Sequence, residues 1–192
     1  MEIKKSKRDL ILKAAVHVFS TKGYHNTKME EIAAAAGVGK GTIYEYFSSK
    51  LHLFQEMMEG SIRFYYQRLI NSTSAGIPFA EKIFLFFEGH IQFCKEHKEL
   101  TRIVFWDAEI IDEELKEWGY IMRKEKESKM CELVQNAIDE GELKPVDPLL
   151  VTHLIGGVLA SLWGPITLED WEVDAGELAR EVTDIIMNGI GN

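Results

Sequence analysis

The sequence predicts an all-α protein of about nine helices, three in an N-terminal domain at residues 1–50 and six in a larger domain at residues 51–192. Apolar residues recur at intervals of three and four along most of the chain, which places them on one face of a helix. No segment of any length shows the period of two that marks a half-buried strand. The chain is also long enough to bury a sizeable core.

The first predicted helix begins after Ser6, because Ser6 and Asp9 have the spacing of a helix start signal. Gly23 ends it. Four basic residues precede or begin this helix, and the sequence leaves open whether they form a solvated tail or contact a polyanion. They are Lys4, Lys5, Lys7 and Arg8, and the apolar stripe behind them is Leu10, Ile11, Ala14, Ala15, Val18 and Phe19.

Two short helices joined by a tight turn follow. The first is expected to begin at Thr27, because Thr27 and Glu30 have the capping-box spacing. Gly37 ends it, because a sharp exit from a helix requires a residue that tolerates a positive φ. The second short helix runs from Gly39 or Lys40 to Phe47. Two short helices around a glycine turn are typical of a helix-turn-helix.

The second short helix has a small, polar outer face. Ile43 and Phe47 are four residues apart and point inward, so Gly41, Thr42 and Glu45 point outward. Lys40, Tyr44 and Tyr46 lie along its flanks. A glycine allows close approach to base edges, and Thr and Glu side chains can read them. Lys and Tyr side chains contact phosphates, so this helix is predicted to lie in the major groove of DNA.

The run from Met29 to Ala33, Ala36 to Phe47 and Lys50 resembles the DNA-binding domain of the tetracycline-repressor (TetR) family of transcriptional regulators. The resemblance covers the first quarter of the chain; Gly39 departs from it, since the family often has Ser or Thr there. It implies that Lys50 meets a phosphate at the start of a fourth helix. The expected DNA-binding residues are Thr27, Lys40, Gly41, Thr42, Tyr44, Glu45, Tyr46 and Lys50.

The charge is divided unevenly along the chain. Residues 1–50 carry 9 Lys and Arg against 5 Asp and Glu, a net charge of +4, whereas the remainder carries 13 against 26, a net charge of −13. Attraction to phosphates acts within about a Debye length, ~8 Å at physiological salt. A basic N-terminal domain can therefore bind DNA although the whole chain has a net charge of −9.

Six further helices are expected after residue 50. The fourth helix is capped by Ser49 and is long enough to connect the two domains, and a loop follows at residues 71–76. Pro78 opens a deeply apolar fifth helix. The remaining predicted helices are 100–106, 113–141, 149–163, which Gly164 and Pro165 end, and 174–187.

The family resemblance implies a homodimer that pairs through the last two helices, each protomer binding one half-site of a palindromic operator. Small residues at Gly156, Gly157, Ala160 and Ser161 allow close helix approach there, although internal packing would explain them too. The expected interface residues are Leu154, Ile155, Val158, Leu159, Leu162, Ile185 and Ile186.

Aromatic and methionine side chains are numerous in the larger domain. Each one by itself is most simply a core residue, but together they resemble the apolar pocket with which the family senses a small molecule. This implies a repressor that releases its operator when the effector binds. Acidic neighbours (Glu88, Asp107, Glu109) would suit a cation, and the Phe-rich fifth helix would suit an acyl chain equally. The expected pocket residues are Met58, Phe64, Phe87, His90, Phe105, Trp106, Trp118 and Met122.

An alternative is a metal- or redox-responsive regulator, because His90, Cys94 and His97 share one helical face at a spacing that suits zinc or copper. Enzyme function is not expected: the sequence lacks G-x-S-x-G, H-E-x-x-H, a P-loop and a strand-linked G-x-G-x-x-G, and no cofactor is implied. With no signal peptide, no disulfide framework and no expected run of about 18 uncharged apolar residues, the predicted compartment is the cytoplasm, away from membranes.

Overall fold

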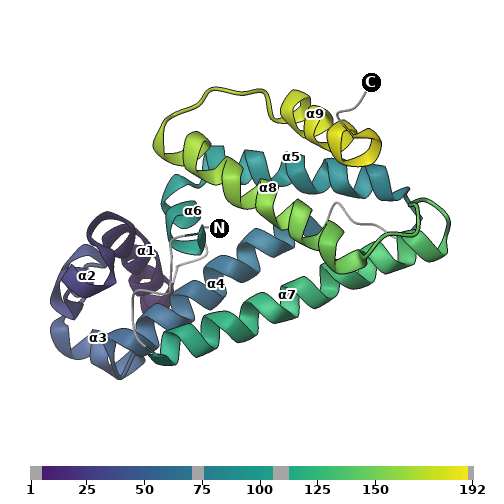
Figure 1. The fold of residues 1–192 in the computed structure, drawn as a ribbon. Helices are drawn as coiled ribbons and strands as arrows, with labels where there is room; N and C mark the ends of the chain where they lie inside the picture. Colours follow the sequence, from purple (N-terminus) through teal and green to yellow (C-terminus); the bar gives the residue numbers. More distant parts are fainter. Residues whose placement is uncertain (1–5, 71–75, 106–112, 190–192) are drawn as a thin grey trace. The chain divides into compact units, whose positions relative to one another are not determined.

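The computed structural model describes residues 6–70, 76–105 and 113–189; for residues 68–70, 104, 105, 113–116, 118, 119 and 122 it describes the backbone alone. Nine helices and no strand occur within these ranges (Figure 1). The predicted all-α class is therefore confirmed. The predicted loop at 71–76 lies outside the described residues except for Gly76, and so does the stretch between the predicted helices 100–106 and 113–141.

The chain forms two compact units. Unit 1 comprises residues 1–64 and 99–112, and unit 2 comprises residues 65–98 and 113–192. The boundary thus falls inside one continuous helix, α4 (Lys50–Ile70), and not at residue 50, where the sequence places it. Helix α6 (Lys98–Phe105) belongs almost entirely to unit 1, although it follows α5 of unit 2 in the chain.

Unit 1 is built on α1 (Lys7–Asn26), whose first turn is closed by the predicted Ser6 and Asp9 pair. Gly23 takes a φ of 73° and breaks the helical geometry near its end, as expected. The predicted apolar stripe is buried except at Leu10, whose side chain is exposed. From α6, Thr101 and Ile103 are buried, and Glu99 binds His17 of α1 at 2.6 Å.

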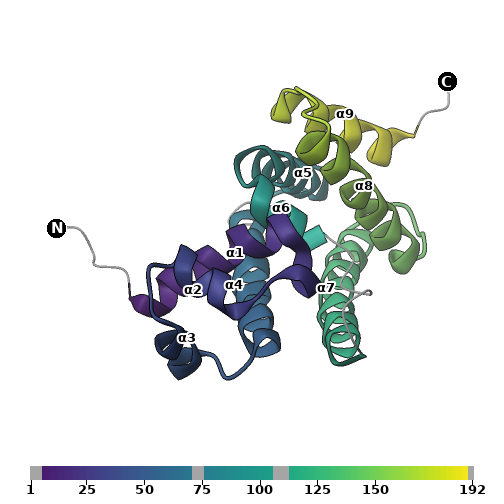
Figure 2. The same ribbon diagram turned by 90° about the vertical axis from the view of Figure 1, so that its left-hand side faces the viewer.

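Helices α2 (Met29–Ala35) and α3 (Lys40–Tyr46) pack against each other in unit 1, as Figure 2 shows. Gly37 has a φ of 68°, which confirms the predicted turn. The predicted start of α2 is wrong: Lys28 is its N-cap, and the Glu31 carboxylate accepts from the Lys28 amide at 2.9 Å. Thr27 is buried instead, and its hydroxyl donates to the Gly23 carbonyl at 2.7 Å.

Unit 2 contains α5 (Phe79–Glu96), α7 (Glu113–Asp139), α8 (Pro148–Leu168) and α9 (Ala175–Asn188). Helix α5 packs against both α8 and α9, and α7 packs against α8 (Figure 1). This position explains why α5 is apolar on most of its surface: two neighbouring helices cover it, so apolar side chains on both sides are removed from water. Its largest fully buried side chains are Phe79, Ile83, Phe87 and Ile91.

The sequence predicts that Gly164 and Pro165 end α8, but the helix continues to Leu168. A proline lacks one N–H donor, so one backbone hydrogen bond is lost while the next turn still forms; the Glu169 amide reaches the Pro165 carbonyl at 3.3 Å. The resulting helix of 21 residues is long and apolar enough to cross a membrane by length and composition. The expectation that no such run exists is therefore wrong, although core helices of soluble proteins also pass this test.

Candidate nucleic-acid interface and effector domain

Helix α3 presents the outer face that the sequence predicts. Ile43 and Phe47 are fully buried and anchor the helix on unit 1. Gly41 and Glu45 are exposed on the other side, and Thr42 is half-buried. Tyr44 and Tyr46 are also exposed, at 44% and 40%. Gly41, Tyr44, Glu45 and Tyr46 thus leave the outer face of α3 uncovered within the protomer.

Lys50 has a role that the sequence does not reveal. Its ammonium group donates to the carbonyls of Tyr24, His25 and Thr27, at 2.8, 3.3 and 3.1 Å. It also lies 4.4 Å from the centroid of the Tyr24 ring. An ammonium group has three donors, so the carbonyls at the end of α1 use its full capacity. The geometry therefore supports a structural role for Lys50, and not the phosphate contact that the resemblance implies.

Replacing Lys50 with Met should destabilise unit 1. The change leaves three carbonyls near the end of α1 without their cation, and hydrogen bonds to a charged donor contribute about 1–3 kcal/mol. We expect a lower thermal midpoint, measured by circular dichroism, and weaker DNA binding in proportion to the unfolded fraction. Lys13→Met, at an exposed lysine of α1, is the control. A variant of unchanged stability that loses only DNA affinity would instead support the phosphate contact.

Other cations of unit 1 are also held within the protein. Lys40 binds Glu30 and Lys22 binds Glu31, both at 2.7 Å, and Arg8 pairs with Glu56. The hydrogen bond from Lys40 lowers the pKa of Glu30, and the same bond raises the pKa of Lys40. Glu30 and Glu31 are already counted in the net charge of +4 for residues 1–50, whereas Glu56 lies outside that range, so its pair with Arg8 offsets one further positive charge.

A buried polar cluster lies in unit 2. The Tyr65 hydroxyl is 2.7 Å from Nδ1 of His90, whose Nε2 is 3.6 Å from Sγ of Cys94. All three side chains are buried. Burial lowers the pKa of His90 to about 4, so its ring is neutral at physiological pH.

This geometry does not favour the predicted metal site. His90 and Cys94 contact each other, but His97 packs its ring on Phe93 and lies 3.8 Å from the Glu96 carboxylate. Within the described ranges, no three His, Cys, Asp or Glu side chains are arranged to hold a metal ion.

Two family descriptions match the chain. "Bacterial regulatory proteins, tetR family" matches residues 11–57, which contain the helix-turn-helix. "Tetracyclin repressor-like, C-terminal domain" matches residues 76–190, more than half of the chain. The chain belongs to the TetR family. It is therefore a DNA-binding transcriptional regulator, and its curated relatives are transcriptional regulators too.

Two relatives and one solved structure match this TetR-family chain over most of its length. The uncharacterized HTH-type transcriptional regulator YhgD of Bacillus subtilis is 29% identical over 91% of this chain and 89% of its own. The fatty acid metabolism regulator protein of B. subtilis is 24% identical over 100% of both chains. The crystal structure of FadR from B. subtilis in complex with stearoyl-CoA has the same fold, with a TM-score of 0.83 at 24% identity over 95% of this chain and 99% of FadR.

The predicted effector-pocket residues of this TetR-family chain are divided between the units. In unit 1, Met58 is buried and Phe64 is exposed. In unit 2, Phe87 and His90 are buried. Trp106 lies outside the described residues, as do the side chains of Phe105, Trp118 and Met122.

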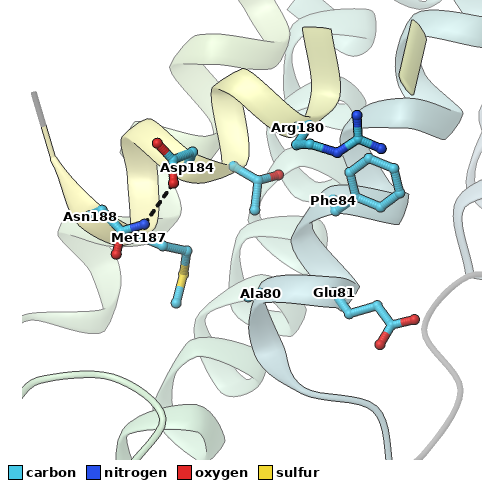
Figure 3. Close-up of a pocket in the computed structure, with 8 residues that line it drawn as sticks. Ala80, Glu81, Phe84, Arg180, Asp184, Met187 and Asn188 are labelled. Carbon is cyan, nitrogen blue, oxygen red and sulfur yellow. Dashed lines mark hydrogen bonds between the residues drawn. The ribbon is translucent and has the colours of Figure 1, made fainter. Parts of the chain in front are cut away.

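A groove of about 330 Å³ lies elsewhere in unit 2, between α5 and α9, and none of the predicted pocket residues lines it (Figure 3). Phe84 and Met187 form its apolar floor. The Arg180 guanidinium lies 5.7 Å from the centroid of the Phe84 ring, and Asp184 accepts a hydrogen bond from Asn188 at 2.7 Å. Charges of both signs surround this groove, so its electrostatics favour neither an anion nor a cation.

The predicted interface residues also separate into two sets. Ile155 and Leu162 are buried within the protomer, on a helix that packs against α5 and α7. Their side chains therefore belong to the protomer core, which corrects that part of the prediction, whereas Val158, Leu159 and Ile186 are half-buried. Leu154 and Ile185 are more than half exposed. Leu150 and Leu168, which the sequence reasoning missed, are exposed on the same face of α8 as Leu154.

Proposed function

We propose that this protein is a homodimeric repressor that binds an inverted-repeat operator and releases it when an acyl-CoA binds the C-terminal domain. The observation that carries this proposal is end-to-end similarity to a fatty acid metabolism regulator, together with a shared fold with FadR bound to stearoyl-CoA. The structure of AibR in complex with isovaleryl-CoA and operator DNA, at a TM-score of 0.79 and 18% identity, supports the same ligand class. Because the proposed operator is chromosomal DNA, the protein acts in the cytoplasm.

The composition of unit 2 is compatible with an acyl chain. Phe79, Phe86, Phe87 and Phe93 of α5 are all buried and offer apolar surface around any cavity that a ligand opens there. Of the predicted acidic set, Asp107 and Glu109 lie outside the described residues, and the Glu88 carboxylate lies beside Gly176, at the start of α9. An apolar chain attached to a polar head is therefore the effector that we favour.

The homodimer is supported by the exposed face of α8. Leu150, Leu154, Gly157, Ser161, Gly164 and Leu168 follow one another at intervals of four and three residues, which is the spacing of a helix–helix seam. The three small residues in the middle of the seam permit close approach of a second helix. Only 22% of the apolar window in α8 is buried within the protomer. An apolar face of this extent requires a cover, and a second copy supplies the same face in a two-fold arrangement.

An effector titration tests the proposal. With the dimer bound to a fluorescent operator, stearoyl-CoA or isovaleryl-CoA should weaken DNA affinity by about 5- to 150-fold, the usual range of allosteric coupling. By linkage, operator DNA should weaken acyl-CoA binding by the same factor. Free CoA is the control for the head group, and stearate is the control for a detergent effect. An alkyltrimethylammonium salt tests the cationic alternative. An operator affinity that stays constant at saturating acyl-CoA would refute the effector assignment while leaving the DNA-binding function intact.

A further inference from the structure

The ion pair between Glu30 and Lys40 joins the first turn of α2 to the start of α3, the expected recognition helix. Lys40 is the first residue of α3, and the first residues of a recognition helix in the major groove contact base edges. Glu30 comes from the first turn of α2, and its carboxylate lies 2.7 Å from Nζ of Lys40. The two side chains are 48% and 68% exposed. If Lys40 enters the major groove, the Glu30 carboxylate therefore enters it at the same place.

A pair of this kind is a poor phosphate contact. A carboxylate beside the ammonium group cancels its charge, so the pair releases few counterions when it approaches the DNA backbone. It also repels the phosphate that Lys40 would bind. The expected role of Lys40 as a phosphate contact on the flank of α3 is therefore not the one that its surroundings favour.

The pair matches the edge of a base pair instead. In the major groove a G·C pair presents two neighbouring acceptors, N7 and O6 of guanine, followed by the N4 donor of cytosine. The O6 and N4 atoms are hydrogen-bonded to each other and thus lie about 3 Å apart. Lysine is suited to the two guanine acceptors and glutamate to the cytosine donor. The separation of 2.7 Å between the two side chains fits that spacing.

An A·T pair fits less well. Its donor, N6 of adenine, lies between two acceptors, N7 of adenine and O4 of thymine. A lysine and a glutamate side by side can satisfy the donor and one acceptor, and the carboxylate is then placed near the remaining acceptor or near the thymine methyl. One of the three groups is left without a partner, and the pair therefore discriminates between the two base pairs.

We propose that Glu30 is a specificity-determining residue, which together with Lys40 reads one G·C base pair in each half-site of the operator, with Lys40 on guanine and Glu30 on cytosine. The inference rests on DNA binding through α3 and not on the identity of the effector. Glu30 thus adds a base contact from outside the recognition helix. The sequence reasoning assigned that kind of contact to Glu45 alone among the acidic residues.

The test is a base-preference profile of the full-length protein and its variants. An operator is first selected from random double-stranded DNA, and the affinity is then measured with each of the four base pairs at every half-site position. The wild type should show one position where replacing G·C by A·T weakens binding by about 5- to 150-fold, the equivalent of one good base contact. In Glu30→Gln and in Lys40→Met, the same replacement should weaken binding severalfold less than in the wild type, because each variant removes one side of the pair.

Glu31→Gln is the matched control, since it removes the same charge from the neighbouring residue, whose partner Lys22 comes from α1 and not from the recognition helix. It should leave the base profile unchanged. Circular dichroism of each variant verifies that unit 1 remains folded. If Glu30→Gln and Lys40→Met alter the affinity for all sequences uniformly, or if the wild type has no G·C position that responds to Glu30→Gln, the assignment is wrong and the pair is a surface ion pair near the backbone.

Discussion

Replacing Leu154 with Lys should convert the protein into a monomer. In the isolated protomer this side chain is 56% exposed, so a lysine is tolerated in the fold. In the proposed dimer it lies on the seam of α8, and two-fold symmetry brings two lysines into the same apolar contact. Burying an unpaired ammonium group costs several kcal/mol. We therefore expect the dimer dissociation constant, measured by analytical ultracentrifugation, to rise by about 1,000-fold or more.

The loss of the dimer should also remove tight operator binding. A single helix-turn-helix reads one half-site, whereas a dimer places two recognition helices about one helical turn apart on the DNA. Ile121→Lys is the matched control, because Ile121 of α7 is 57% exposed and the change in charge is the same. It should leave the dimer intact. A Leu154→Lys variant that remains dimeric, with the stability of the wild type, would exclude this face of α8 as the interface.

The parts of the fold that follow from local signals were predictable. The recognition helix is one: the period of Ile43 and Phe47, the glycine turn at Gly37 and the polar outer face together define it, and the structure confirms the burial pattern. Local signals also determine α9, whose N-cap Asp174 accepts from the Glu177 amide at 2.8 Å. Such features depend on residues within one or two turns of each other, which a sequence displays directly.

The features that the sequence missed depend on contacts between distant residues. Lys50 reaches carbonyls that are 23 to 26 positions earlier in the chain, and no local pattern indicates that its donors are used there. Thr27 stands at the capping-box distance from Glu30, but its hydroxyl donates to the Gly23 carbonyl of α1 and therefore does not cap α2. The membership of α6 in unit 1 likewise depends on tertiary packing, as does the Tyr65 and His90 contact across 25 positions. Sequence spacing alone specifies neither.

Replacing Gly41 with Leu should separate DNA binding from stability. A Cβ atom at Gly41 would meet no other group within 4 Å, so the fold accepts a side chain there. Because glycine disfavours helix by about 1 kcal/mol relative to good helix formers, the variant should unfold at a slightly higher temperature. The leucine would nevertheless stand on the face of α3 that approaches the base edges. We expect its affinity for the operator to fall to the level of random DNA, a loss of about 1,000-fold or more.

The series Gly41→Ala and Gly41→Leu controls for the gain in helix propensity, since both substitutions favour the helix but only leucine fills the space in front of it. Alanine should retain much of the operator affinity, and the difference between the two variants then measures how closely the backbone of α3 approaches the bases. Fluorescence anisotropy on operator and random duplexes gives both affinities at one salt concentration. If leucine binds the operator as tightly as glycine does, the outer face of α3 does not lie against the bases, and the contacts assigned to Thr42 and Glu45 fail with it.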